Sequence, residues 1–145
     1  YKVAQKDIEA DAVQLKHCQT LIAVKLGLQS WNELHTLLSF ENAQTQLDFG
    51  TLFHKPACNV FLNHWFADYE SARKQLSYGS DYFLLPYKKQ FVVARQNYLN
   101  TLDIHSALSE QWQSINHDLV AGYATDAWDQ IAKRAIEHKL LALFQ

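Results

Sequence analysis

The sequence predicts an α+β fold: an N-terminal helical hairpin, a small antiparallel sheet of three or four strands, and a long C-terminal helix packed on the sheet. Apolar residues recur at steps of three and four near both ends of the chain, which is the period of a helix with one buried face. The middle of the chain carries short runs rich in Phe, Tyr, Leu and Val, which favour strands. The length of 145 residues suits a single domain. Within it, the helical hairpin 7–38 can be a sub-unit, and 58–145 hold the sheet and the last helix.

Composition excludes several classes of protein. Hydrophobic residues make up 48% of the chain and charged residues 19%, which excludes intrinsic disorder. The formal charge is −2, so no basic field covers the whole protein. No apolar run approaches the roughly 18 residues of a membrane span, and the first twenty residues do not form a signal peptide. These observations predict a cytoplasmic protein with no membrane partner, in which both cysteines are reduced.

The N-terminal part predicts two helices joined by a tight turn. The first runs from about Ile8 to Leu26, with Cys18 on its apolar face, and Gly27 follows as a left-handed stop. Ser30 with Glu33 three residues later is typical of a capping box that begins the second helix. Its inner face holds Trp31, Leu34, Leu37 and Leu38.

A polar connector from Ser39 to Ala57 follows, and we expect an ordered loop because apolar residues interrupt it. They are Leu47, Phe49, Leu52 and Phe53. The segment Cys58–Phe66 predicts a strand. Asp68 predicts the N-cap of a helix that ends at Gly79.

Two further strands, Asp81–Leu85 and Gln90–Ala94, flank a predicted four-residue hairpin loop, 86–89. Both faces of these strands are apolar, because Phe83 and Leu85 alternate with Tyr82 and Leu84. The pattern therefore predicts a sheet that is covered on both sides.

The last third of the chain predicts a short helix, Gln96–Leu102, and a final strand within Trp112–Val120. Thr125 or Asp126 is expected to cap the C-terminal helix. Its apolar stripe contains Trp128, Ile131, Ala132, Ala135 and Ile136.

Two segments carry a resemblance to known groups of proteins. Leu15–Leu34, with Leu26-Gly27-Leu28 followed by Trp31-Asn32-x-Leu34, resembles a helical motif of uncharacterised bacterial proteins, some of them glyoxalase-related. Leu28 stands where an aromatic residue is usual. The patterns Trp-Phe-Ala-x-Tyr (65–69) and Leu-Leu-Pro-Tyr-x-x-Gln-Phe (84–91) resemble small uncharacterised bacterial proteins of plasmid and integron gene-cassette type. The resemblance implies a bacterial mobile-element protein and brings no catalytic residues.

Two sets of side chains are candidates for binding. The aromatic residues Trp65, Tyr69, Tyr82 and Tyr87 could line a ligand pocket, or they could belong to the core. The basic residues Lys88, Lys89 and Arg95 could form a patch for an acidic partner or a nucleic-acid backbone, or they could simply be solvated near a hairpin tip.

Motifs for catalysis, metals and cofactors are missing from the sequence. The seven histidines include no His-Glu-x-x-His pattern, and four glycines build no phosphate-binding loop. The sequence therefore predicts no catalytic residue, no metal and no cofactor. The helical hairpin has the spacing of a helix-turn-helix, but its second helix contains no Lys or Arg for phosphates, so specific DNA binding is not expected.

These observations favour a non-enzymatic binding or protein-interaction protein. The alternative is a small-molecule-binding protein or enzyme with a pocket between helices and sheet, and the second alternative is a weak nucleic-acid binder. The apolar end of the last helix predicts a homodimer, unless the connector covers that end within the same chain. The residues concerned are Leu140, Leu141, Leu143 and Phe144.

Overall fold

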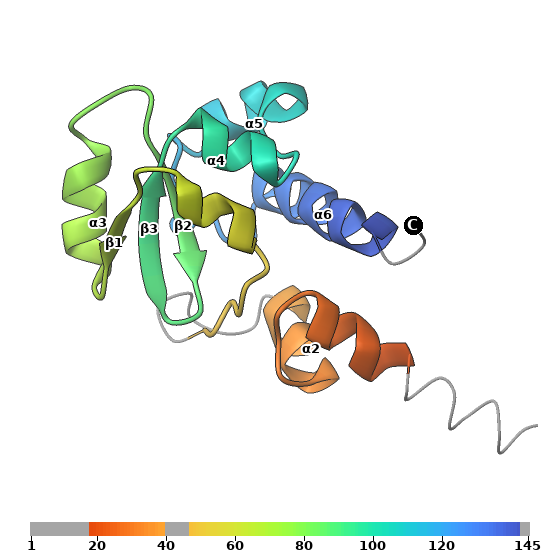
Figure 1. The fold of residues 1–145 in the computed structure, drawn as a ribbon. Coiled ribbons are helices and arrows are strands. Elements are labelled where there is room, and N and C mark those ends of the chain that lie inside the picture. Colours follow the sequence, from red (N-terminus) through yellow and green to blue (C-terminus); the bar gives the residue numbers. More distant parts are fainter. Residues whose placement is uncertain (1–17, 40–46, 143–145) are drawn as a thin grey trace, which may run out of the picture.

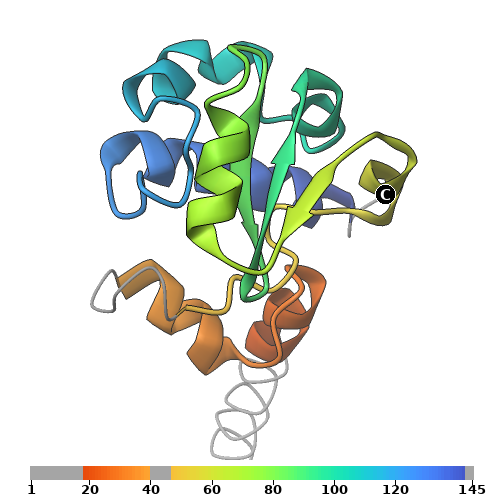
Figure 2. The same ribbon diagram turned by 90° about the vertical axis from the view of Figure 1, so that its left-hand side faces the viewer.

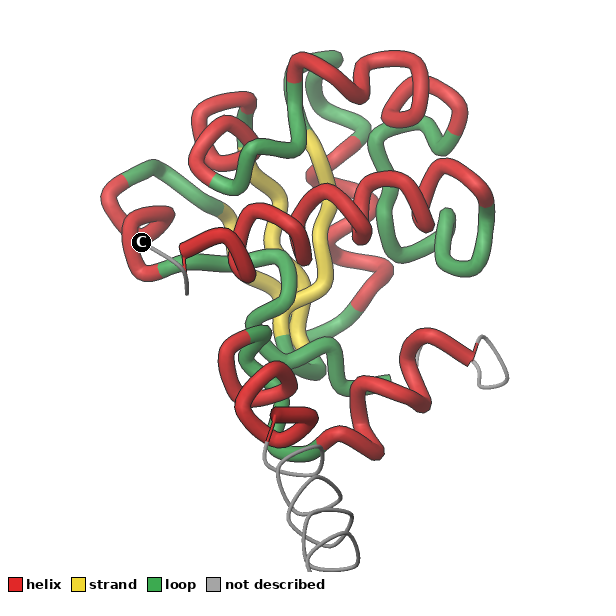
Figure 3. The backbone as a smooth tube through the Cα atoms, turned by 90° about the vertical axis from the view of Figure 1, so that its right-hand side faces the viewer, coloured by secondary structure: helices red, strands yellow, loops and turns green. Residues whose placement is uncertain are grey.

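A computed structural model describes residues 18–39 and 47–142, and Figure 1 shows their arrangement. Residues 18–25 are helical and are followed by helix α2 (Trp31–Ser39). A three-stranded antiparallel sheet forms the centre, with strand order β1-β3-β2. Its strands are β1 (His64–Phe66), β2 (Phe83–Tyr87) and β3 (Gln90–Ala94). The C-terminal helix α6 (Asp126–Leu141) crosses one face of this sheet (Figure 3). The predicted α+β class is confirmed.

The sheet is covered on both faces, as the alternation of its apolar residues predicts. Phe83, Leu85 and Val92 face the larger core, which also holds residues of the connector, α4 (Gln96–Thr101), α5 (Ser109–Ser114) and α6. Leu84 and Val93 face the opposite way into a smaller core under α3 (Tyr69–Leu76). Figure 2 shows α3 lying in front of the strands, with the helical pair 18–39 below the hairpin end of the sheet.

The turn between the first two helices is built as its sequence indicates. Gly27 has a φ of +86°, its N–H donates to the Val24 carbonyl at 2.9 Å, and the Leu28 N–H donates to the Ala23 carbonyl at 2.9 Å. This is the Schellman arrangement that ends a helix at glycine. Ser30 Oγ then accepts from the Glu33 N–H at 3.2 Å, whereas the Glu33 carboxylate accepts from the Gln29 N–H instead of closing the predicted box on Ser30.

Two side chains assigned to the inner faces of the helical pair lie outside instead. Cys18 is exposed, and Leu38 is 41% exposed. Leu34 and Leu37 are buried as expected, and Trp31 is half-buried against the core. The first half of the predicted helix Ile8–Leu26 lies outside the described residues.

The connector is ordered over 47–57, and its four apolar side chains are buried as predicted. Its backbone ties distant segments together. The Thr51 N–H donates to the Gly27 carbonyl at 3.2 Å, the Phe49 N–H donates to the Lys88 carbonyl at 3.0 Å, and the Lys88 N–H donates to the Gly50 carbonyl at 2.8 Å. The connector therefore joins the helical pair to the tip of the β2–β3 hairpin. Residues 40–46 of the predicted connector fall outside the described ranges.

Three predicted segments differ from the structure near the sheet. Only His64–Phe66 of the expected strand Cys58–Phe66 pairs, because Pro56 begins the 3₁₀ helix η2 (Pro56–Val60). The hairpin turn consists of Lys88 and Lys89 only and is shorter than the predicted loop 86–89. Pro86 belongs to β2, because an edge strand tolerates proline, and the positive φ of Lys88, +52°, makes the tight turn possible. The helix begun by Asp68 ends at Leu76, before Gly79.

The expected last strand within Trp112–Val120 is also wrong. Residues 106–114 form η3 (Ser106–Leu108) and α5, and backbone pairing with the sheet is reduced to one parallel bridge between Leu84 and Asp118. Asn116 and His117 have φ values of +55° and +63°, which no extended strand can accommodate. The apolar residues of this segment therefore fill the core from a helix and a series of turns.

Helix α6 begins and packs as predicted. Thr125 is its N-cap, with Oγ1 accepting from the Trp128 N–H at 3.2 Å. The stripe of Trp128, Ile131, Ala132 and Ala135 is buried, and one charged residue, Lys139, continues it. Leu141 is 62% exposed, while Leu143 and Phe144 are outside the described part of the chain.

Replacing Gly27 by alanine is expected to lower the free energy of unfolding by about 1–2 kcal/mol, because its positive φ strains any other residue. A Cβ there would also lie 1.6 Å from Thr51 Oγ1 and 2.7 Å from the Thr51 nitrogen. Urea denaturation measures the effect. Gly79→Ala is the matched control, since its Cβ would meet the carboxylate of the exposed Asp81 first, at 2.8 Å. Equal stability of the two variants would contradict the assigned role of this turn.

Candidate functional site

Several basic side chains gather around a cavity where the connector meets the end of α6. This cavity of about 200 Å³ takes its walls from three segments: the end of the helix 18–25, the connector with the start of η2, and the last turn of α6. Within residues 18–39 and 47–142, its lining includes three lysines and two histidines and contains no Asp or Glu. The lining residues are Lys25, Thr51, His54, Lys55, Pro56, His138, Lys139 and Ala142. We call this cavity the cationic pocket.

Lys139 is the central residue of the cationic pocket. It lies four residues after Ala135 on the buried stripe of α6, which places its side chain in the interior, and it is only 7% exposed. Its Nζ donates a hydrogen bond to the Thr51 carbonyl. Across the two described ranges, no carboxylate forms an ion pair with it. A buried ammonium without a counter-charge is rare, since such charges are normally paired.

The surroundings of Lys139 disfavour its charged form. Burial is the main cause that lowers its pKa to about 8; the nearby Cys58 acts in the opposite direction, and repulsion from Lys55 and Lys25 adds to the lowering. An ordinary lysine has a pKa near 10.4. The cationic pocket therefore carries a positive charge that no described residue of its lining compensates.

His54 forms the inner wall through a short chain of hydrogen bonds. Its Nδ1 lies 2.7 Å from the Tyr98 hydroxyl, and that hydroxyl donates to the Phe53 carbonyl at 3.0 Å. Because a hydroxyl has one proton to donate, Nδ1 must be the donor to Tyr98, and the lone pair is on Nε2. Burial, and then the charge of Lys139, lower the pKa of His54. His54 is therefore a neutral imidazole at pH 7.

Lys55 and His138 pair across the pocket. Lys55 Nζ lies 3.3 Å from His138 Nε2. A protonated amine can only donate, so His138 Nε2 is the acceptor in this contact. In the cationic pocket, the two histidines therefore offer hydrogen-bond acceptors at Nε2, and the lysines carry the positive charge.

The predicted aromatic pocket residues divide between the two faces of the sheet. Trp65 and Tyr87 contact the His54 ring, with centroids 5.7 and 4.9 Å away, and lie behind the inner wall of the cationic pocket. Tyr69 and Tyr82 pack against the smaller core on the other face. The structure therefore brings together two of the four.

Tyr69 and Tyr82 have structural partners there. The Tyr69 hydroxyl donates to the buried Asp118 carboxylate, and burial together with this bond raises the Tyr69 pKa. Asp118 also accepts from the backbone N–H groups of Val120 and Ala121. The Tyr82 ring lies 5.8 Å from that of His64.

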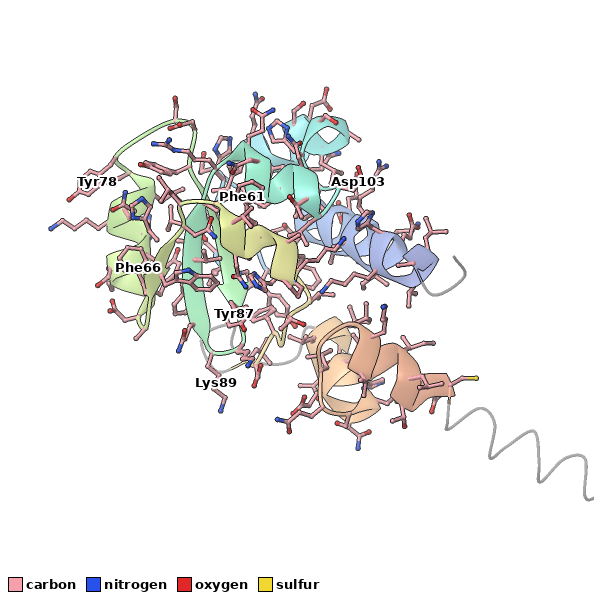
Figure 4. All side chains as sticks on the ribbon, in the orientation of Figure 1. Phe61, Phe66, Tyr78, Tyr87, Lys89 and Asp103 are labelled. Carbon is pink, nitrogen blue, oxygen red and sulfur yellow. The ribbon has the colours of Figure 1, made fainter. Side chains whose placement is uncertain are left out.

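The three basic patch candidates lie at two ends of β3. Lys88 and Lys89 form the hairpin turn, where Figure 4 shows Lys89 projecting from the tip. Arg95 follows the other end of the strand, 3.5 Å from an Asp81 carboxylate oxygen and next to the Tyr82 ring. The three side chains do not form one patch.

A second cavity of about 250 Å³ lies between α4, α5 and the start of β2. Phe83, His105, Trp112 and His117 contribute to its lining. His117 stacks on Phe83 with 4.2 Å between ring centroids, and its Nδ1 is 3.0 Å from the Tyr82 carbonyl. This cavity includes Asp81 and lacks the concentration of like charge that marks the cationic pocket.

Sequence reasoning missed the cationic pocket. It counted His54 and His138 among scattered histidines and did not consider Lys25, Lys55 or Lys139. One signal was available: Lys139 continues the apolar stripe of α6 at the spacing of a buried residue. The other lining residues follow no periodic pattern.

Comparisons with protein-family models, curated proteins and solved structures found no match to this chain. The resemblance to bacterial gene-cassette proteins therefore stays a prediction. Among residues 18–39 and 47–142, no group of three His, Cys, Asp or Glu side chains could hold a metal ion. None of the helices in those ranges is long and apolar enough to cross a membrane.

Proposed function

We propose that this protein binds a small anionic molecule, carrying a phosphate or carboxylate group, in the cationic pocket. The observation that carries the proposal is the buried Lys139, which lines a cavity together with two further lysines and no carboxylate. An anion would supply the missing counter-charge and accept hydrogen bonds from the ammonium groups. The proposal is compatible with the predicted non-enzymatic binding protein and with the alternative, a small-molecule-binding protein or enzyme.

The size of the cavity supports a small ligand. About 200 Å³ is below the range of roughly 300–1,000 Å³ that drug-sized ligands occupy. Lys139 is nearly inaccessible from outside, so the backbone of a nucleic-acid duplex could not reach it. A weak nucleic-acid binder is accordingly the less favoured function.

Isothermal titration calorimetry with inorganic phosphate, pyrophosphate and citrate tests the proposal. We expect at least one of these anions to bind, and Lys139→Met to weaken that binding about 10- to 100-fold through loss of a charge-assisted hydrogen bond. Lys133→Met is the matched control, because Lys133 lies on the exposed side of the same helix. Its affinity should equal that of the wild type. Absence of binding, or an equal loss in both variants, would contradict the proposal.

The same titration has a defined pH dependence. The bound anion favours protonated Lys139, whose pKa is about 8 in the empty pocket. Binding above pH 8 must therefore take up a proton, and the affinity should fall as the pH rises. Calorimetry in two buffers of different ionisation enthalpy measures that uptake, and Lys139→Met should abolish it.

The homodimer and the cytoplasmic location belong to this proposal as well. The 62% exposed Leu141 near the end of α6 supports association through that helix. The free thiols of Cys18 and Cys58 support a reducing compartment.

A further inference from the structure

The amine of Lys139 has the surroundings of a nucleophile as well as those of an anion ligand. It lines the cavity, it is buried, and the Thr51 carbonyl is its one hydrogen-bond acceptor within the described residues. Lysines that react with carbonyl compounds are typically desolvated or placed next to another cationic group. Lys139 meets both conditions, since Lys25 and Lys55 line the same cavity.

We propose that Lys139 forms an imine with an aldehyde or ketone whose carboxylate or phosphate group is held by the lysines of the cationic pocket. The inference rests on the proposed function, because the anionic group is what positions the carbonyl. It adds a class of ligand, the small anionic carbonyl compound, and a covalent step.

The covalent step requires only the two reactants. The neutral Nζ attacks the carbonyl carbon, a C–N bond forms, and the carbonyl electron pair moves to the oxygen, which takes up a proton while the nitrogen loses one. The resulting carbinolamine loses its hydroxyl group and the remaining N–H proton as water, which leaves a C=N bond. No electron is gained or lost, so the step needs no oxidant or reductant.

The structure supports this step in two ways. With a pKa of about 8, about one tenth of Lys139 is neutral at pH 7, against less than a thousandth of an ordinary lysine. His54 lines the same cavity as a neutral imidazole with an unprotonated Nε2, and it can carry the proton between nitrogen and oxygen.

Cys58 is a further nucleophilic side chain near the site, and it does not compete. Its side chain is fully buried and is not part of the cavity lining. Burial raises the pKa of its thiol, which leaves little of the reactive thiolate at neutral pH. The proposal therefore assigns the reaction to Lys139 and not to Cys58.

Reductive trapping tests the proposal on the full chain. The protein is incubated with glyoxylate and cyanoborohydride at pH 7.5, and the modified lysines are located by peptide mass spectrometry. We expect carboxymethylation of Lys139 about tenfold or more faster than that of the exposed Lys133, in line with its larger neutral fraction. Labelling at similar rates on all lysines would overturn the proposal.

Two comparisons test the role of the anionic group in the wild-type protein, so they do not depend on a variant that folds. Acetaldehyde lacks the carboxylate and should label Lys139 about tenfold more slowly than glyoxylate, since it loses the charge-assisted contacts. Inorganic phosphate should protect Lys139 and leave the labelling of Lys133 unchanged. Equal labelling by both aldehydes without protection would overturn the proposal.

The failure of this inference can be told apart from failure of the proposed function. If phosphate binds and depends on Lys139 but glyoxylate never labels Lys139 selectively, the imine is wrong and anion binding holds. Lys139→Arg keeps the charge and removes the nucleophile, and we expect it to bind phosphate without being labelled at position 139. If phosphate, pyrophosphate, citrate and glyoxylate all fail to engage the pocket, both are wrong.

Discussion

Lys139→Met is expected to raise the free energy of unfolding by about 2–3 kcal/mol at pH 7 in anion-free buffer. A folded-state pKa of about 8 for Lys139, against 10.5 for a lysine in water, corresponds to roughly 3 kcal/mol of destabilisation when the group is charged. Methionine has a similar shape and no charge, so it removes this cost. The substitution also removes the hydrogen bond to the Thr51 carbonyl, and this loss reduces the gain in stability by about 1 kcal/mol.

The pH dependence identifies the cause of this effect. Between pH 8 and 10 the unfolded chain keeps the Lys139 proton and the folded protein releases it, so the stability of the wild type rises with pH through this window. The methionine variant lacks this rise, and the difference between the two proteins should shrink towards pH 10. Tyr69 and Tyr98, whose pKa values are raised mainly by burial, act in the opposite direction above pH 10 in both proteins.

Urea denaturation at pH 7, 8.5 and 9.5 measures the difference. Lys133→Met should stay within about 0.5 kcal/mol of the wild type at each pH, as surface substitutions usually do. Added phosphate should narrow the gap between wild type and Lys139→Met, because it stabilises only the protein that binds it. A methionine variant less stable than the wild type at pH 7, or a gap independent of pH, would show that Lys139 is not an uncompensated charge.

Trp128→Ala is expected to lower the free energy of unfolding by about 3–5 kcal/mol, the usual cost of removing a buried tryptophan. Trp128 is fully buried, and its ring packs nearly perpendicular to those of Tyr123 and Phe53, with ring centroids 4.9 and 6.1 Å apart. Phe53 belongs to the connector and Trp128 to α6, so their contact joins two walls of the cationic pocket. The variant should therefore also bind anions more weakly, although Trp128 does not line the cavity.

Trp65→Ala is the control for the size of the deleted side chain. Trp65 is 41% exposed on the edge strand β1, so its removal should cost much less. Chemical denaturation of the wild type and both variants under the same conditions compares their free energies of unfolding. A loss below about 1 kcal/mol for Trp128→Ala would mean that the junction of α6 with the connector is not part of the main core.

Local signals predicted most of the fold correctly. Gly27 and Ser30 mark the turn between the first two helices, and Thr125 with the apolar stripe after it marks α6. These signals are reliable because a helix cap or an apolar stripe depends only on residues that are close together in the sequence. Strand propensity was less reliable: the apolar segment Trp112–Val120 had the composition of a strand but folds as a helix and turns. Its burial comes from tertiary packing, which composition does not specify.

The site was predictable only in part, for a similar reason. A lysine on the stripe of α6 is visible in the sequence, but its meaning depends on what it faces. The Thr51 carbonyl and Lys139 are 88 residues apart, and no periodicity connects them. The aromatic candidates stood out because aromatic residues are concentrated in that part of the sequence. Two of the four, Tyr69 and Tyr82, pack against the smaller core and away from the cationic pocket.

The position of Thr51 also sets the order in which the site can assemble during synthesis. Its N–H is bonded to Gly27, which precedes it, and its carbonyl to Lys139, which is made much later. All three strands lie within 64–94, so the sheet can pair while α6 is still inside the ribosome. Until residue 139 emerges, Thr51 lacks its lysine and the cationic pocket lacks a wall. A ribosome-bound chain can therefore already contain the sheet before the cationic pocket is complete.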